Sequence, residues 1–85
     1  MVYKIEFKNS AQKEFYKIPE KDRIRIWEKL NQLAVSEFGL DIKWLENEDG
    51  LKRLRVGDYR VIYKKYEILT IIEVVKVAIR KDAYK

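Results

Sequence analysis

The 85-residue sequence contains no cysteine and no histidine, and it has only three glycines and one proline. Without cysteine the chain can form neither a disulfide nor a catalytic thiolate. Without histidine, Ser-His-Asp and Cys-His catalysis are excluded, and carboxylates are the only strong metal ligands that remain. No P-loop, dinucleotide-binding glycine pattern or metal motif is present. We therefore expect no cofactor and no bound metal.

Long hydrophobic runs are also missing. No apolar stretch approaches the ~18 residues of a membrane helix, and the alternating N-terminus has no secretory pattern. The chain is therefore expected to be soluble and cytoplasmic, without membrane association. Hydrophobic residues still make up 47% of it, which is enough to close a core. No repeat or linker divides the sequence, so residues 1–85 are predicted to form a single domain.

Positive charge is concentrated in the second half of the chain. Residues 1–50 hold nine Lys and Arg against ten Asp and Glu, a net charge of −1. Residues 51–85 hold ten against four, a net charge of +6, and the two halves give the formal +5. Such a basic half is typical of a surface that binds nucleic acid, an acidic membrane or an acidic protein segment. A generically basic, solvated surface explains the charge about equally well.

The first half of the chain predicts one strand and two helices. Residues 2–7 alternate apolar and polar side chains, which indicates a strand. A short helix is predicted after the N-capping residues Asn9 or Ser10. Pro19 is expected to begin a second helix and Gly39 to end it, because proline suits a first helical turn and glycine a left-handed cap. Residues 40–50 are predicted to be a polar connection with a short turn around residues 42–45.

Three more strands are predicted in the second half, at residues 51–56, 59–66 and 68–77. The last is nearly continuously apolar, so it is placed centrally, with both faces covered. The predicted fold is therefore α+β, of order β-α-α-β-β-β, with an antiparallel-rich sheet and a helical pair on one face.

Gly57 and Asp58 lie between two strand-like runs and predict a two-residue hairpin turn. This turn sets Val56 opposite Tyr59 and Arg55 opposite Arg60, and opposed side chains share a face. One face then carries the apolar residues Leu54, Val56, Tyr59, Val61 and Tyr63. The other face carries Arg53, Arg55 and Arg60, whereas Lys52 is turned to the core side.

Like charges that face one another across two strands destabilise a sheet by up to ~1 kcal/mol. A carboxylate from Asp82, from Glu73 or from a helix would relieve this repulsion. The functional alternative is a phosphate site, because phosphate oxygens match the fork of a guanidinium group. The basic C-terminal segment, with Arg80, Lys81 and Tyr84, either adds to such a site or is an ordinary solvated end.

Two blocks of sequence resemble a known family, the RelE/ParE toxin superfamily. Residues 51–63 are similar to its central signature and read LKRLRVGDYRVIY. Residues 77–84 are similar to its closing motif and read VAIRKDAY. The opening, with Tyr3, Ile5, Phe7 and the pair Ile18-Pro19, also follows the family pattern. The resemblance therefore covers nearly the whole chain.

The resemblance implies the toxin of a type II toxin–antitoxin module with a RelE-like, microbial-ribonuclease-like fold. In the RelE branch such toxins cleave mRNA in the ribosomal A site, with the 2′-hydroxyl as nucleophile and no metal. The motifs then assign catalytic roles to Arg53, Arg60, Arg80 and Tyr84, and Arg55 matches a further basic position beside them. Substrate binding is expected from Arg55, Lys52 and Lys81. The implied partners are a cognate acidic, RelB-like antitoxin in a heteromeric complex, and ribosome-bound mRNA.

The sequence departs from the family pattern in the central signature and in the closing motif. Arg53 and Leu51 stand where some RelE members have lysines, and Lys52 is turned to the core side by the predicted register. Ala78-Ile79 stands where Gly-His or Gly-Lys is common. Two alternatives to the RNase remain: a ParE-type toxin that inhibits DNA gyrase by binding, and an inactive nucleic-acid-binding descendant.

Overall fold

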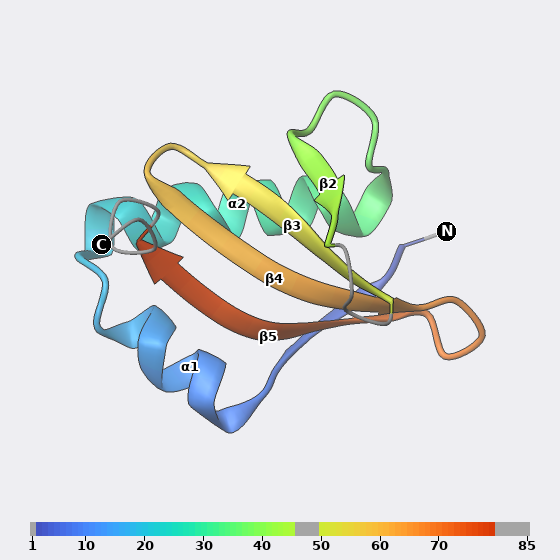
Figure 1. The fold of residues 1–85 in the computed structure, drawn as a ribbon, viewed down its shortest axis with the longest axis horizontal. Helices are drawn as coiled ribbons and strands as arrows, with labels where there is room; N and C mark the ends of the chain where they lie inside the picture. Colours follow the sequence, from blue (N-terminus) through green and yellow to red (C-terminus); the bar gives the residue numbers. More distant parts are fainter. Residues whose placement is uncertain (1, 46–49, 80–85) are drawn as a thin grey trace.

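The computed structural model describes residues 2–45 and 50–79. Within these residues, two helices and five strands follow one another (Figure 1). In chain order they are β1 (Lys4–Phe7), α1 (Asn9–Tyr16), α2 (Glu20–Val35), β2 (Ile42–Trp44), β3 (Leu51–Val56), β4 (Tyr59–Tyr66) and β5 (Ile71–Ile79). Neither helix in the described part of the chain is long and apolar enough to span a membrane.

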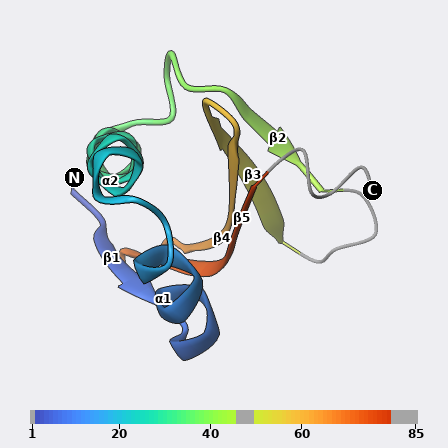
Figure 2. The ribbon, with the colours of Figure 1, turned by 90° about the vertical axis from the view of Figure 1, so that its left-hand side faces the viewer.

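The five strands form one sheet in the order β1-β5-β4-β3-β2. Only β1 runs parallel to its neighbour, β5, and the other three pairs are antiparallel. Both helices lie on the same face of the sheet (Figure 2). We call the face that neither helix covers the open face. The predicted α+β architecture, with an antiparallel-rich sheet and a helical pair on one face, is therefore confirmed.

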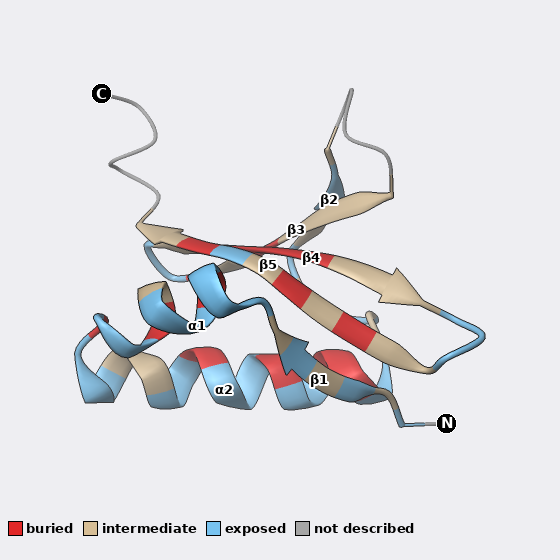
Figure 3. Ribbon diagram, turned by 90° about the horizontal axis from the view of Figure 1, so that it is seen from below, coloured by how far each residue is buried: buried red, intermediate tan, exposed pale blue. Residues whose placement is uncertain are grey.

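The core lies between the helices and the covered face of the sheet. Figure 3 shows buried residues at intervals along α1 and α2 and in the strands β3, β4 and β5, because core-facing side chains recur every three to four residues along a helix and alternate along a strand. The fully or almost fully buried members of this core are Ala11, Ile26, Leu30, Leu33, Leu54, Val61, Tyr63, Ile72 and Val74.

Three details of the predicted elements are wrong. The connection after α2 contains the short edge strand β2, which pairs with β3. Three residues are too few for the sequence to show the alternation that marks a strand. The helix α2 ends at Val35, and Gly39, at φ +83°, lies in the turn that follows. Strand β5 starts at Ile71 and not at residue 68, because residues 67–70 form a turn in which Thr70 has φ +53°.

The prediction that the last strand is covered on both faces is also wrong. Strand β5 is internal, between β1 and β4, and β4 occupies the middle of the sheet. The buried residues of β5 point to the helices, whereas Ile71 and Glu73 of the same strand are half-buried and Lys76 is exposed. The open face is therefore accessible along β5.

Candidate phosphate-binding site

The β3–β4 hairpin turns through Gly57 and Asp58, and Gly57 has φ +58°, in the left-handed region. The predicted register is confirmed: Val56 pairs with Tyr59, Arg55 with Arg60, and Arg53 with Ile62. A two-residue turn of this kind sets the pairing of both strands, which is why this part of the fold can be read from a short stretch of sequence.

Arg53, Arg55 and Arg60 lie together on the open face, and we call them the arginine set. Their strand neighbours Leu54 and Val61 are fully buried beneath the helices, so the alternating arginines project from the other side. Lys43 pairs with Arg53 across β2 and β3, which brings a fourth cation to the same face. This lysine was missed in the sequence because strand β2 was not predicted.

The Nε atoms of all three arginines are buried and donate no hydrogen bond to a described residue. The stems of these side chains therefore pack on the sheet. Arg53 Nη2 donates to Asp41, whereas the terminal nitrogens of Arg55 and Arg60 donate no hydrogen bond to another described residue. An oxyanion is the ligand that such donors bind best.

A carboxylate neutralises part of the arginine set, as the structural alternative anticipated, but the residue is Asp41. Its Oδ1 accepts a hydrogen bond from Arg53 Nη2 at 2.9 Å, and its Oδ2 lies 3.7 Å from Arg55 Nε. The carbonyl oxygen of Asp41 also accepts the backbone N–H of Arg55 at 3.0 Å, which fixes this residue beside β3. Among the described residues, no carboxylate lies within 4.0 Å of the Arg60 guanidinium.

The carboxylates named in advance do not fill this role where they are described. Glu73 accepts a hydrogen bond from Tyr66 at 3.3 Å. The helix residue Glu14 binds the Lys76 ammonium at 3.4 Å and the backbone N–H of Val77 at 3.0 Å. Asp82 lies outside the described residues. Nothing in the local sequence marks Asp41, a single aspartate in a polar connection, as the partner of two arginines.

Lys52 lies on the covered side of the sheet, away from the arginine set. Its ammonium group binds Glu37 at 2.8 Å and lies 4.4 Å from the centre of the Trp44 ring, and its side chain is only 14% exposed. The register predicted this orientation, so we correct the assignment of Lys52 as a substrate-binding residue and leave it out of the site.

Glu37 also accepts a hydrogen bond from the Tyr63 hydroxyl at 3.0 Å. Burial alone would raise the pKa of Glu37, but the hydrogen bonds from Lys52 and Tyr63 outweigh it, so this pKa is lowered. Burial, together with the hydrogen bond to Glu37, raises the pKa of Tyr63. These three residues join the segment after α2 to β3 and β4, and so brace the sheet that carries the arginines.

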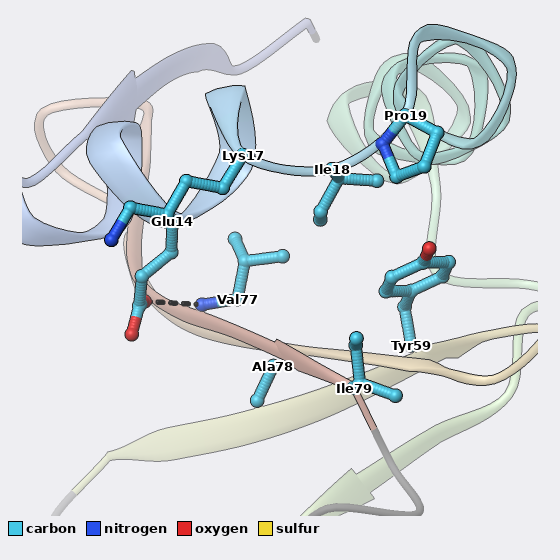
Figure 4. A pocket seen from close by; sticks show the side chains of 8 residues that line it. All are labelled: Glu14, Lys17, Ile18, Pro19, Tyr59, Val77, Ala78 and Ile79. Atoms are coloured by element: carbon cyan, nitrogen blue, oxygen red, sulfur yellow. Dashed lines mark hydrogen bonds between the residues drawn. The ribbon is translucent and has the colours of Figure 1, made fainter.

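The end of β5 approaches the site from the other side of β4. Ala78 pairs with Arg60 and Ile79 with Tyr59. Below them, a cavity of about 280 Å³ opens between the sheet and the helices (Figure 4). It is lined by Glu14, Lys17, Ile18, Pro19, Tyr59, Val77, Ala78 and Ile79.

The Tyr59 hydroxyl donates a hydrogen bond to Asp22 at 2.7 Å, and this bond raises the pKa of Tyr59. Tyr59 is therefore a structural link between the hairpin and α2. The remaining predicted site residues, Arg80, Lys81 and Tyr84, lie outside the described residues, and their roles stay predictions.

No protein-family model and no curated protein sequence matches this chain. Solved structures do. The chain is similar to one in the archaeal RelE–RelB complex from Pyrococcus horikoshii OT3, with 28% identity over 94% of this chain and 97% of that one, at a TM-score of 0.77.

Two further structures have the same fold. The toxin–antitoxin complex RelBE2 from Mycobacterium tuberculosis matches with 23% identity over 94% of this chain and 100% of that one, at a TM-score of 0.82. The isolated RelE toxin from E. coli matches with 22% identity over 91% of this chain and 83% of that one, at a TM-score of 0.78. The fold of this chain is that of the RelE toxins, and its predicted resemblance to the RelE-like toxin superfamily is confirmed.

Proposed function

We propose that this chain is the toxin of a type II toxin–antitoxin module and cleaves mRNA on the ribosome as a metal-independent endoribonuclease. The observation that carries the proposal is the arginine set on the open face of a RelE fold. Two of its members, Arg55 and Arg60, face one another at a cost in stability, and Arg60 has no carboxylate partner among the described residues. A bound phosphodiester would relieve this repulsion.

The proposed reaction is attack of the ribose 2′-oxygen on the adjacent phosphorus. The 2′-oxygen–phosphorus bond forms and the bond from phosphorus to the 5′-oxygen breaks. The 2′-hydroxyl loses one proton, and the leaving 5′-oxygen gains one. The phosphorane between these steps is dianionic, and Arg60, with Arg53 and Arg55, would stabilise its charge. The buried stems of these arginines hold the guanidinium groups against the sheet, so little reorganisation is needed.

Proton transfer requires a different group. A guanidinium group is a poor base because its pKa exceeds ~12. The resemblance assigns Tyr84 to this task, and nearby cations would make its hydroxyl more acidic. The position of Ala78 opposite Arg60 supports a role for the residues that follow β5. Replacing Tyr84 with Phe should then preserve RNA binding and slow only the chemical step.

The toxin would depend on the ribosome because this site should bind and orient free RNA only weakly. The arginine set lies on an open sheet face, and Asp41 already offsets part of its charge. Such a surface gains most from a partner that orients the substrate. The proposed target places the active toxin in the cytoplasm.

A RelB-like antitoxin is the proposed protein partner. Several of the similar structures are complexes of RelE with RelB. An acidic segment of such an antitoxin would neutralise the basic half of this chain, which carries +6 over residues 51–85. The affinity of the complex should therefore fall as salt is added, mainly through the association rate. A complex insensitive to salt would show that apolar contacts dominate.

Induction of the chain without its antitoxin tests the proposed function. Protein synthesis, followed by incorporation of labelled methionine, should stop before DNA synthesis does. If DNA synthesis stops first while translation continues, the chain acts as a ParE-type inhibitor of gyrase. If neither stops although the folded protein accumulates, the chain is a nucleic-acid-binding descendant without activity.

A further inference from the structure

The Asp41 carboxylate lies against guanidinium nitrogens of Arg53 and Arg55, which a phosphate would also bind. The Arg53 side chain is only 13% exposed and its Nε is buried, so few of its donors are accessible. One of its terminal nitrogens, Nη2, is bound by the Asp41 carboxylate at 2.9 Å. The other carboxylate oxygen is turned to Arg55. A carboxylate and a phosphate present similar oxygens to a guanidinium fork, so the two compete for the same nitrogens.

The Asp41 side chain is 52% exposed, unlike the arginine that it binds. Water screens an ion pair on the side of its exposed partner, so this pair contributes little, equivalent to no more than about a fivefold change in an equilibrium constant. Its backbone is held beside β3 by the hydrogen bond from Arg55, but the carboxylate can rotate into water. Asp41 can therefore release the arginines at low cost when a stronger anion arrives.

We propose that Asp41 is a built-in counter-ion, which holds Arg53 and Arg55 in the free protein and which a phosphate of the RNA backbone displaces. The inference rests on the proposed function, since it takes RNA phosphate as the ligand of the arginine set. Arg60 makes the first contact, because it has no competing carboxylate among the described residues. Asp41 then acts as a specificity-determining residue that weakens the binding of loose RNA.

The test is the affinity of a short 2′-O-methyl RNA oligonucleotide, which has no free 2′-hydroxyl and cannot be cleaved by this route. Binding is measured by fluorescence anisotropy at low salt for Asp41→Asn and for the control Glu28→Gln. Glu28 is an exposed residue of α2 and its replacement changes the net charge equally. Asp41→Asn should bind the oligonucleotide about three- to tenfold more tightly than the control. Equal or weaker binding overturns the inference.

A third variant separates this inference from the proposed function. Arg60→Gln should weaken oligonucleotide binding at least threefold. If it does so while Asp41→Asn binds no more tightly than Glu28→Gln, only the counter-ion role of Asp41 is wrong. If Arg60→Gln binds as the wild type does, or if neither the wild type nor Asp41→Asn binds at low salt, the arginine set is no phosphate site and both proposals fall.

A measurement on the wild-type protein guards against a misfolded Asp41→Asn variant. In protein labelled with ¹³C and ¹⁵N, the Asp41 carboxyl carbon and the Arg53 side-chain Nε should both shift as the oligonucleotide is added. A shift of the Arg53 signal while the Asp41 signal stays unchanged means that phosphate binds without displacing the carboxylate, and it overturns the inference.

Discussion

Replacement of Arg60 with Gln separates the chemistry of the arginine set from the stability of the fold. Arg60 lies directly opposite Arg55, its Nε is buried without a partner among the described residues, and no described carboxylate pairs with its guanidinium group. Glutamine keeps part of the aliphatic stem but removes the charge and the orphaned donor. The substitution therefore removes two unfavourable terms and few favourable ones.

The expected size of the effect follows from these terms. A like-charged pair across two strands costs about 0.2–1 kcal/mol. Relief of a buried, unpaired donor adds up to roughly 1–3 kcal/mol, and the loss of stem packing offsets part of the gain. We expect the free energy of unfolding to stay unchanged or to rise by about 1 kcal/mol. In a domain of this size that raises the melting temperature by up to roughly 4–8 °C.

Thermal and urea unfolding of Arg60→Gln and of the control Lys29→Gln measure this prediction. Lys29 is exposed on α2, and its replacement removes the same charge on the other side of the sheet. In a ribosome cleavage assay, Arg60→Gln should lose about 10²–10³-fold in rate, the usual effect of removing one donor to a developing oxyanion. If Arg60→Gln is instead less stable than the control by more than about 1 kcal/mol, Arg60 is a structural residue and the reasoning is wrong.

Three further predictions concern the scaffold. Hydrogen bonds from Lys52 and Tyr63 lower the pKa of Glu37 despite its burial. The ionised carboxylate therefore stabilises the folded protein above the pKa that Glu37 has in the unfolded chain, and this stabilisation is lost as the pH falls below about 5. Glu37→Gln should lower the free energy of unfolding by roughly 1–3 kcal/mol at pH 7 and flatten its decrease between pH 5 and pH 3, as measured by urea unfolding at each pH; an unchanged pH profile would show that Glu37 does not brace the sheet. Gly57→Ala should lower the free energy of unfolding by about 1–2 kcal/mol in the same assay. Alanine is strained at φ +58°, and its Cβ would lie 3.1 Å from an Arg25 nitrogen. Equal stability would mean that the turn changes its conformation to accommodate alanine. Val61→Ala, at a fully buried site, should cost about 1–3 kcal/mol while cleavage per folded molecule stays normal; a loss of cleavage in the folded fraction would contradict this separation of core and site.

The parts of this fold that sequence predicts well are those set by local geometry. A two-residue turn at Gly57 and Asp58 fixes the pairing of β3 and β4, so the shared face of Arg55 and Arg60 follows directly. The same alternation correctly turns Lys52 towards the core. These inferences need no knowledge of distant parts of the chain.

The missed parts depend on contacts between distant segments. Strand β2 is only three residues long and becomes a strand by pairing with β3. Asp41 reaches Arg53, twelve residues further along, only because that pairing forms. A polar connection gives no periodic signal from which such a contact could be predicted. The sequence therefore predicts that a carboxylate neutralises the arginines but does not identify Asp41 as that carboxylate.

The most direct test of the account is the position of mRNA cleavage in a purified translation system. Primer extension on a translated mRNA should reveal cuts inside the codon held in the ribosomal A site when the wild-type chain is added. The same RNA without ribosomes should stay nearly intact, and Arg60→Gln should leave both RNAs uncut over the same time. Equal cutting of ribosome-free RNA, or cleavage by Arg60→Gln at the wild-type rate, would contradict the claim that the arginine set acts on ribosome-bound mRNA.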